Sequence, residues 1–387
     1  MVLRGVLTPA RTLLPGPRRR ARGGGGQVHE PIHREERAQV RDNRGARLTL
    51  LLSALLPLAI LFAASVGSSG LGPLDLLRAA AQALGFGDFG LSEVDLAILL
   101  DVRLSRVLLS VVVGGGLGAA GVIFQGILLN PLADPFTVGV SSGAALGAST
   151  AILLGLGGYT ALGLGLLPLA AFAGAILALG AVHLLASRHG YAGSGTLILA
   201  GIVVSTTLSA AISLLKSLNE DSVSSIVFWI MGSLTGRGWG HLLFCLPYVL
   251  AGLILALILG RDLDLMALGE EGAKQLGVDA LKVRRALLIG ASVITGACVA
   301  VSGVIGFVGL VVPHLVRTAT GPSHRALLIN SFLGGGLLLA LADAMSRTLL
   351  PGGEELPVGV VTALVGGPFF CYLLGRNPLG RTMGGSK

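Results

Sequence analysis

Long apolar runs, separated by short polar turns, constrain this sequence more than any other feature. Its 387 residues are 53% hydrophobic and only 12% charged, and the mean hydropathy is +0.83. A soluble domain has about a quarter of its residues charged, so most of this chain carries too few charges for a surface in water. Apolar runs of about 20 residues match the length of a helix that crosses a bilayer. The sequence therefore predicts an all-α integral membrane protein.

We expect about ten membrane spans per subunit. Their predicted ranges are residues 48–66, 104–129, 136–156, 161–185, 196–218, 241–260, 286–305, 307–319, 327–349 and 357–374. The eighth range is too short to cross an untilted bilayer of about 30 Å, and it contains Pro313. We expect a half-length helix there, which is tolerable only where protein or a cavity surrounds it.

The distribution of basic residues predicts the orientation of these spans. Residues 1–47 are rich in arginine and hold the start of the first span on the cytoplasmic side. We predict a disordered cytoplasmic tail over 1–47, a membrane domain over 48–375 and a cytoplasmic tail over 376–387. The net charge of +8 comes largely from the first tail and from cytoplasmic loops, so it does not indicate a nucleic-acid partner. The predicted location is the cytoplasmic (inner) membrane, with both termini inside.

Residues 262–285 form the longest charge-rich interruption after the N-terminal tail. Apolar residues recur there at near-helical spacing, opposite a charged face. The apolar set is Leu265, Leu268, Ala273 and Leu276, and the charged set is Glu270, Glu271 and Lys274. Gly277 is suited to end a helix, and Asp279 is suited to cap the next one. Charged side chains cannot lie in hydrocarbon, so we expect one or two short helices in water, which either bind another protein or form an ordinary solvated loop.

Three arginines fall on the outer face of this topology, where positive charge is not expected. Arg103 and Arg106 are three residues apart and share one helix face, and Arg347 ends the ninth span. Arg347 either pairs locally with Asp343, one turn earlier, or joins the other two in binding carboxylates of an extracytoplasmic partner. The planar guanidinium suits the second interpretation, because it can bind a carboxylate through two donors.

Other patterns argue against enzymatic chemistry in this chain. The GxGxxG match at residues 116–121 follows no strand, and the spacing of Gly114 and Gly118 is typical of close helix packing. There is no Gly-Lys-Ser/Thr P-loop, so any ATP hydrolysis must come from another chain. No histidine or cysteine has metal-ligand spacing, and we expect no cofactor. The spans nearly lack acidic residues and lysine; Asp343 is the main candidate for a proton relay.

Residues 222–234 predict a short amphipathic helix outside the membrane, between the fifth and sixth spans. This helix either lies over the mouth of a pathway or anchors at the lipid interface through Trp229.

Several motifs in order resemble the permease family of iron-complex and cobalamin ABC importers. They are RLSR at 103–106, Gln125, NPLADP at 130–135, GVSSG at 139–143, LGE at 268–270 with Ala273 and QLG at 275–277, GFVGLVVPH at 306–314, LAD at 341–343 with Arg347, and ELPVGVVT at 355–362. The resemblance runs from about Leu48 to Arg376 and leaves out only the N-terminal tail. It implies the type II ABC importer permease fold, about ten spans per subunit and a dimer, for which we expect two identical chains.

The resemblance also implies partners and residue roles. Two cytoplasmic ABC ATPase subunits would bind the loop of the sixth and seventh spans, through Leu268, Gly269, Glu270, Glu271, Ala273, Leu276 and Gly277. An extracytoplasmic substrate-binding protein would dock on Arg103, Arg106 and Arg347. Loops carrying Asn130, Leu132, Ser194 and Gly195 would narrow the inner end of the pathway, although residues 194–195 form no distinctive motif.

By this resemblance, the chain is a permease subunit that moves an iron–siderophore, haem or cobalamin into the cell, and the separate binding protein selects the cargo. Two other hypotheses stay open from the residues alone. An ion-coupled secondary transporter would work without an ATPase, and a membrane scaffold would move nothing.

Overall fold

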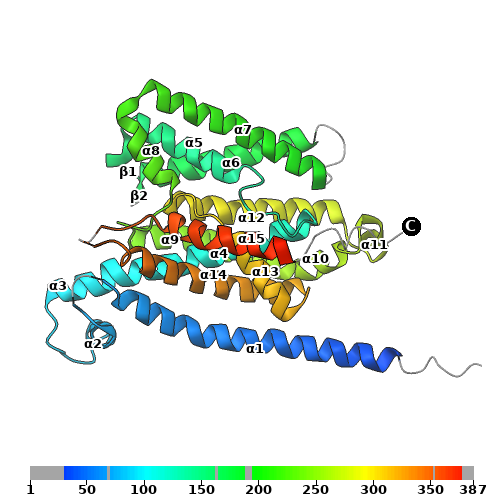
Figure 1. Cartoon of the computed structure of the whole chain (residues 1–387), viewed down its shortest axis with the longest axis horizontal. Coiled ribbons are helices and arrows are strands. Elements are labelled where there is room, and N and C mark those ends of the chain that lie inside the picture. Colours follow the sequence, from blue (N-terminus) through cyan, green and yellow to red (C-terminus); the bar gives the residue numbers. More distant parts are fainter. Residues whose placement is uncertain (1–29, 68–69, 162–163, 188–193, 352–353, 377–387) are drawn as a thin grey trace, which may run out of the picture. The chain divides into compact units, whose positions relative to one another are not determined.

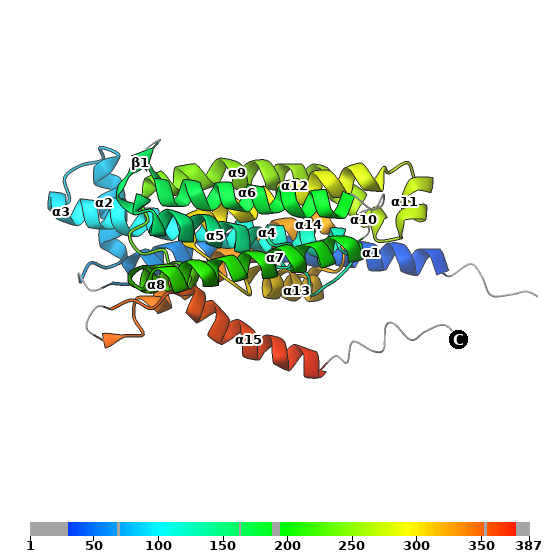
Figure 2. The same cartoon turned by 90° about the horizontal axis from the view of Figure 1, so that it is seen from above.

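The computed structural model describes residues 30–67, 70–161, 164–187, 194–351 and 354–376. The chain divides into two compact units, Met1–Val40 and Arg41–Lys387. Within the described ranges the larger unit is almost wholly helical, and its one small sheet pairs Thr160–Ala161 (β1) with Leu164–Gly165 (β2) in antiparallel register. In both Figure 1 and Figure 2, the long helices of this unit run roughly along one direction.

The helices follow the apolar runs closely. They are α1 Glu30–Ser65, α2 Pro73–Ala83, α3 Glu93–Leu96, α4 Ser105–Ile127, α5 Val140–Leu153, α6 Leu166–Ser187, α7 Ser194–Leu218, α8 Val223–Ile230, α9 Trp239–Ile258, α10 Gly260–Met266, α11 Glu270–Gln275, α12 Ala280–Ser302, α13 Val308–Thr320, α14 His324–Ser346 and α15 Val358–Arg376. A π-helical stretch, Ala97–Leu104, joins α3 to α4 without a break, and short 3₁₀ turns occupy Leu156–Gly158 and Glu220–Ser222.

Each of the ten predicted spans contains one helix, so the all-α membrane architecture is confirmed. Within the described residues, seven helical segments are long and apolar enough to cross a membrane. The other three predicted spans correspond to α5, α13 and α15, of which α5 has 14 residues and α13 has 13. The second span is longer than predicted, because the segment Glu93–Ile127 is continuous over 35 residues. Arg103, which precedes the predicted range, therefore lies within this helical segment, as Arg106 does.

The short eighth span has the predicted character. Helix α13 contains Pro313 and starts after Phe307, whose φ of +68° is left-handed, and α12 ends earlier, at Ser302 before Gly303. Thirteen residues rise only about 20 Å, less than the hydrocarbon thickness. Val308 and Val312 are buried, so protein surrounds much of this helix.

The N-terminal helix differs from the prediction. Helix α1 begins at Glu30, inside the stretch that the sequence predicted to be disordered to residue 47. Pro31 is tolerated in the first turn, and the residues that follow are mostly Glu, Arg, Ala and Gln, which favour helix. This charged segment therefore extends the apolar span backwards as helix. Residues 1–29 and 377–387 of the two predicted tails lie outside the described residues.

Helix α4 lies at the centre of the larger unit, against α9, α12, α13 and α14. The membrane-crossing segment that contains it is 94% buried over its most apolar window. A Cβ on Gly114 would collide with the Gly335 carbonyl oxygen of α14, and one on Gly118 with that of Ser331. The predicted packing role of this glycine spacing is confirmed, because only glycine lets the two backbones approach so closely.

The polar elements occupy opposite ends of the unit. In both views α10 and α11 lie at one end, and α2, α3 and α8 lie at the other. Helices α5, α6 and α7 pack on one another, and α12 lies between this group and α4. The predicted amphipathic helix is present as α8, with Ile226 fully buried.

Candidate functional site

The platform, which we define as α10, α11 and the first turns of α12, is the charged loop that the sequence singled out. Gly269 and Gly277, at either side of α11, have φ values of +92° and +84°, which glycine adopts without strain. The predicted helix stop at Gly277 is therefore confirmed. The Asp279 carboxylate accepts a hydrogen bond from the Lys282 backbone N–H at 3.1 Å, which confirms the predicted cap of α12.

Two leucines of the platform point away from the protein. Leu268 is 66% exposed and Leu276 is 58% exposed, whereas Ala273 between them is fully buried. The predicted apolar side is therefore divided, because Ala273 attaches α11 to the bundle while the leucines remain uncovered. Burying a leucine side chain is worth about 1.5–3 kcal/mol, so this pair can contribute substantially to binding of a partner.

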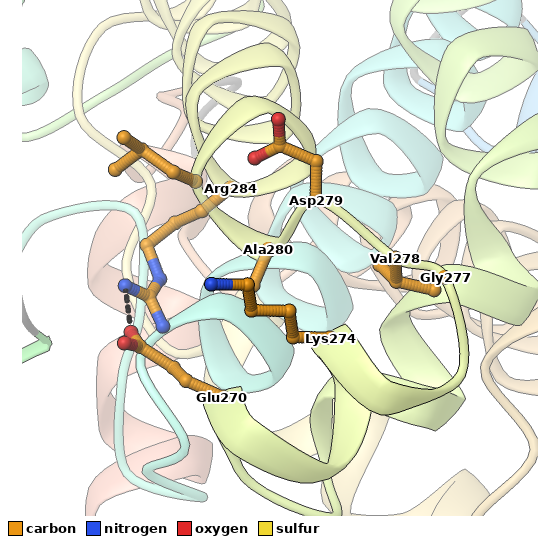
Figure 3. Close-up of a pocket in the computed structure, with 8 residues that line it drawn as sticks. Glu270, Lys274, Gly277, Val278, Asp279, Ala280 and Arg284 are labelled. Carbon is orange, nitrogen blue, oxygen red and sulfur yellow. Dashed lines mark ion pairs between the residues drawn. The ribbon is translucent and has the colours of Figure 1, made fainter.

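A cleft of about 510 Å³ opens between α11 and α12 (Figure 3). Glu270 and Lys274 line it from α11, and Arg284 lines it from α12. The Arg284 Nη1 atom lies 2.6 Å from Glu270 Oε1, and the arginine side chain is only 6% exposed. Glu270 therefore joins α11 to α12, although 44% of its side chain is exposed, and Glu271 is exposed as well.

A contact that the sequence did not predict ties the platform to the ninth span. The Asp264 Oδ1 atom of α10 accepts a hydrogen bond from the His324 backbone N–H at 2.9 Å and lies 2.6 Å from His324 Nδ1. Ser323, at the cap position of α14, makes no side-chain capping bond. Asp264 thus caps α14 from a different helix. The two residues are 60 positions apart, so no local pattern could have found them.

Arg106 of α4 binds two carboxylates from distant parts of the chain. Its Nε and Nη2 atoms donate to Asp343 Oδ1 of α14 at 3.0 and 2.8 Å. Its Nη1 atom lies 2.9 Å from Oε2 of Glu355, in the segment before α15. We call Arg103, Arg106, Arg347, Asp343 and Glu355 the arginine cluster.

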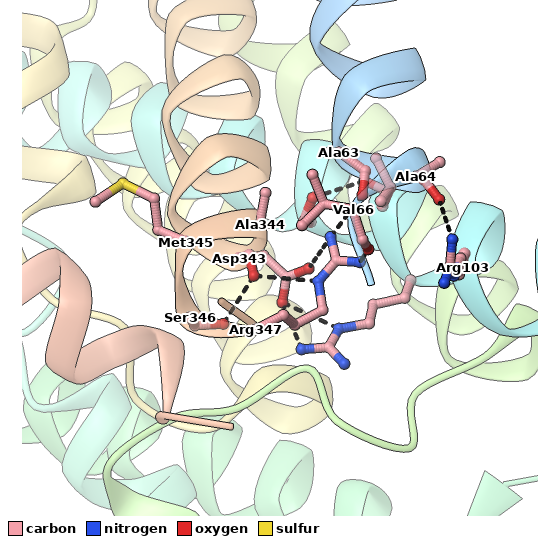
Figure 4. Close-up of polar contacts among 12 residues, drawn as sticks. Ala63, Ala64, Val66, Arg103, Asp343, Ala344, Met345, Ser346 and Arg347 are labelled. Carbon is pink, nitrogen blue, oxygen red and sulfur yellow. Dashed lines mark hydrogen bonds and ion pairs between the residues drawn. The ribbon is translucent and has the colours of Figure 1, made fainter. Parts of the chain in front are cut away.

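The other two arginines of the cluster bind the end of α1 (Figure 4). Arg347 donates to the carbonyl oxygens of Ala63 and Val66, each at 2.8 Å, and its Nη2 atom lies 3.2 Å from Asp343 Oδ2. The local Asp343–Arg347 pair is therefore present. Arg103 Nη1 lies 3.3 Å from the Ser65 carbonyl oxygen.

The arginine cluster is largely shielded from solvent. Arg103 and Arg106 are each 7% exposed, and the Arg347 side chain is 6% exposed. The structure brings the three predicted docking residues together, but it turns their guanidinium groups towards the chain itself. Glu355 is the more open carboxylate, with 28% of its side chain exposed against 0% for Asp343. Burial raises the pKa of Glu355, but the Thr235 hydroxyl and Arg106 outweigh it and hold that pKa below its usual value.

The predicted gate residues lie in two separate segments. Asn130 and Leu132 belong to the turn after α4, where the Asn130 side chain accepts a hydrogen bond from the Leu132 N–H at 2.9 Å. Ser194 and Gly195 form the first turn of α7.

A second cavity, of about 270 Å³, opens between α5 and α7. Ser141 and Ser142 line it from α5, and Ser209, Ser213 and Lys216 line it from α7. Ser141 and Ser142 belong to the GVSSG motif noted in the sequence, whereas Ser209 and Ser213, four residues apart on α7, were not singled out. Such a polar wall is unfavourable against lipid and suits a water-filled route or a second subunit.

The chain is similar in sequence to known transport proteins. The family model described as the FecCD transport family matches residues 55–376. The cobalamin import system permease BtuC of Halobacterium salinarum is 43% identical over 286 residues, which cover 74% of this chain and 75% of that protein. The hemin transport system permease HmuU of Yersinia pestis is 40% identical over 329 residues, which cover 85% of this chain and 96% of that protein.

The fold has a solved counterpart as well. A structure described as an inward-facing conformation of a metal-chelate type ABC transporter matches with a TM-score of 0.74 at 32% identity. The match covers 86% of this chain and all of the other, 100%. Sequence and fold therefore point to the same class of membrane protein.

Proposed function

The chain belongs to the FecCD transport family, and we propose that, as the permease subunit of an ABC importer, it moves an iron–siderophore complex, haem or cobalamin into the cell. Relatives named for haem and for cobalamin support this cargo class. The chain would form a multi-pass homodimer in the cytoplasmic membrane, with both termini inside. ATP hydrolysis would belong to a partner subunit.

The exposed leucine pair of the platform carries the proposal of an ATPase partner. Leu268 and Leu276 flank the short helix α11, which lies between Gly269 and Gly277 and is held against the bundle by the buried Ala273. The bond between Arg284 and Glu270 and the cap from Asp264 attach the platform to α12 and α14. A displacement of the leucines by the ATPase would therefore be transmitted to α12 and α14, as coupling to nucleotide-driven motion requires.

The opposite end would receive the substrate-binding protein. Arg103, Arg106 and Arg347 lie together where the end of α1 meets α4 and the end of α14. Helices α2 and α3 contact the stretch that carries Arg103, and in both views they lie at the end away from α10 and α11. The serine-lined cavity at α5 and α7 supports a route between the two ends, with Asn130, Leu132, Ser194 and Gly195 at its inner end. Only 28% of the most apolar window of α7 is buried within the subunit, which leaves a face for the second copy of the chain.

The test replaces both platform leucines, Leu268→Asp together with Leu276→Asp. We expect the ATPase subunit to be lost on copurification and uptake to fall at least tenfold, because two apolar contacts worth about 1.5–3 kcal/mol each are removed. Leu84→Asp is the matched control, since Leu84 is 74% exposed at the end of α2. Normal copurification and uptake in the double variant would refute the platform assignment.

A second experiment, removal of the ATPase subunit, distinguishes the proposed importer from an ion-coupled carrier. Uptake that survives removal of the ATPase subunit, but stops when an uncoupler is added, would favour the carrier.

A further inference from the structure

The arginine cluster cannot bind a partner's carboxylate simply by contact, because Arg106 already binds carboxylates of its own chain. The Arg106 side chain is only 9% exposed, and Asp343 and Glu355 occupy its Nε, Nη1 and Nη2 atoms. A carboxylate from another protein can reach Arg106 only if one internal carboxylate leaves. This inference rests on the proposed function, since it concerns how the binding protein docks.

We propose that Glu355 is an internal competitor, whose carboxylate occupies the position on Arg106 that an acidic side chain of the binding protein takes on docking. The exchange replaces one carboxylate by another, so Arg106 is never left as an unpaired buried charge. That matters because removing one partner of a buried ion pair is far more unfavourable than exchanging it.

Asp343 is fixed too firmly to be the group that leaves. It is fully buried, and both Arg106 and Arg347 bind it. Glu355 binds Arg106 and has 28% of its side chain exposed. It also lies outside the helices, between α14 and α15, so its side chain can turn away from Arg106 without the movement of a helix.

Departure of Glu355 would have an effect beyond Arg106. The Thr235 hydroxyl donates a hydrogen bond to Glu355 Oε2 at 2.6 Å. Thr235 belongs to the segment between α8 and α9, and its hydroxyl accepts a hydrogen bond from Ser233 at 2.9 Å. The backbone N–H of Ser233 in turn donates to the Ser302 carbonyl oxygen at the end of α12. Glu355 therefore joins the arginine cluster to the segment that follows α8.

The charge balance favours an acidic partner. Three arginines outnumber the two carboxylates of the cluster, which leaves it positive even with Glu355 in place. When Glu355 withdraws, the positive potential at the outer rim of Arg106 increases. An acidic side chain is then attracted and held by the same planar donors.

The test is Glu355→Gln, which preserves the shape of the side chain and removes its charge. We expect the affinity of the purified binding protein for the reconstituted transporter to rise by about two- to tenfold, because the competitor becomes weaker. Glu354→Gln is the matched control, since Glu354 is an exposed acid one residue earlier. It removes the same charge from the same face without touching Arg106.

A rise for Glu355→Gln that exceeds the rise for Glu354→Gln supports the competitor. Thr235→Val should raise the affinity in the same direction by a smaller factor, because it removes the other bond that holds Glu355 in place. Equal changes in the two glutamate variants, or weaker binding in Glu355→Gln with an unchanged melting temperature, would overturn the inference while leaving docking intact. Absence of binding by the wild-type transporter would refute docking itself.

Discussion

The platform and the arginine cluster differ in which of their side chains face outwards and which are paired inside the chain. On the platform Leu268 and Leu276 face outwards, and the ion pair of Arg284 and Glu270 closes its base. In the arginine cluster, by contrast, nearly every charge is turned inwards and already paired. If both ends dock partners as proposed, the first can bind as it stands, whereas the second must rearrange before it can bind a carboxylate. The two docking steps of the proposed transporter would therefore differ in kind.

The largest effect that follows from this difference is on stability. Arg106→Ala should lower the free energy of unfolding by about 3–5 kcal/mol, since it leaves the buried Asp343 without its main partner. Arg78→Ala is the control, because the Arg78 and Asp75 side chains of α2 form an exposed pair, 46% and 26% accessible, expected to contribute under about 1 kcal/mol. Thermal unfolding in detergent measures both. Similar losses for the two variants would show that the cluster is not an internal structure.

At the platform end a smaller loss is expected from the cap that α10 provides. Asp264→Ala removes the acceptor for the His324 N–H and should cost about 1–2 kcal/mol. It should also reduce uptake more than ATPase binding, since Leu268 and Leu276 remain in place while their link to α14 is cut. Asp262→Ala, in the first turn of the same helix, is the control. If both variants lose uptake equally, the capping contact does not transmit motion.

The contacts of Arg106 with Asp343 and of Asp264 with His324 could not be predicted from the sequence. The ten helices follow from hydropathy, and the platform's stop at Gly277 and cap at Asp279 follow from local chemistry, so each was found within a window of a few residues. The pair of Arg106 and Asp343 joins residues 237 positions apart. The sequence singled out each residue separately, but no local pattern indicated that they bind each other.

The degree to which each helix is buried could not be predicted from the sequence either, because α4 and α7 are similarly apolar. Their segments have mean hydropathies of 2.2 and 2.1, yet one is 94% buried and the other 28%. Hydropathy separates membrane from water, but it does not separate a helix at the centre of the protein from one at its edge. The glycine spacing on α4 was the one local signal, since Gly114 and Gly118 approach α14 directly. The arginines were read as exposed for the same reason, because their three-residue spacing defines a shared face but not what covers it.

The smallest predicted effect concerns pH and returns to Glu355. Its pKa lies below the ordinary value of 4.5, although burial alone would raise it, because Thr235, Arg106 and the nearby Arg347 favour the charged form. A carboxyl group with a lowered pKa stabilises the fold above its unfolded pKa, and this contribution disappears as the pH falls through the folded pKa. The melting temperatures of wild type and Glu355→Gln should therefore converge below about pH 4.5, by an amount equivalent to a few tenths of a kcal/mol, since the group is partly exposed and screened. Glu354→Gln should show no such convergence relative to wild type. A constant difference between wild type and Glu355→Gln across this range would mean that Glu355 makes no charged bond to Arg106, and the contrast between an open end and a self-occupied end would then lose its main support.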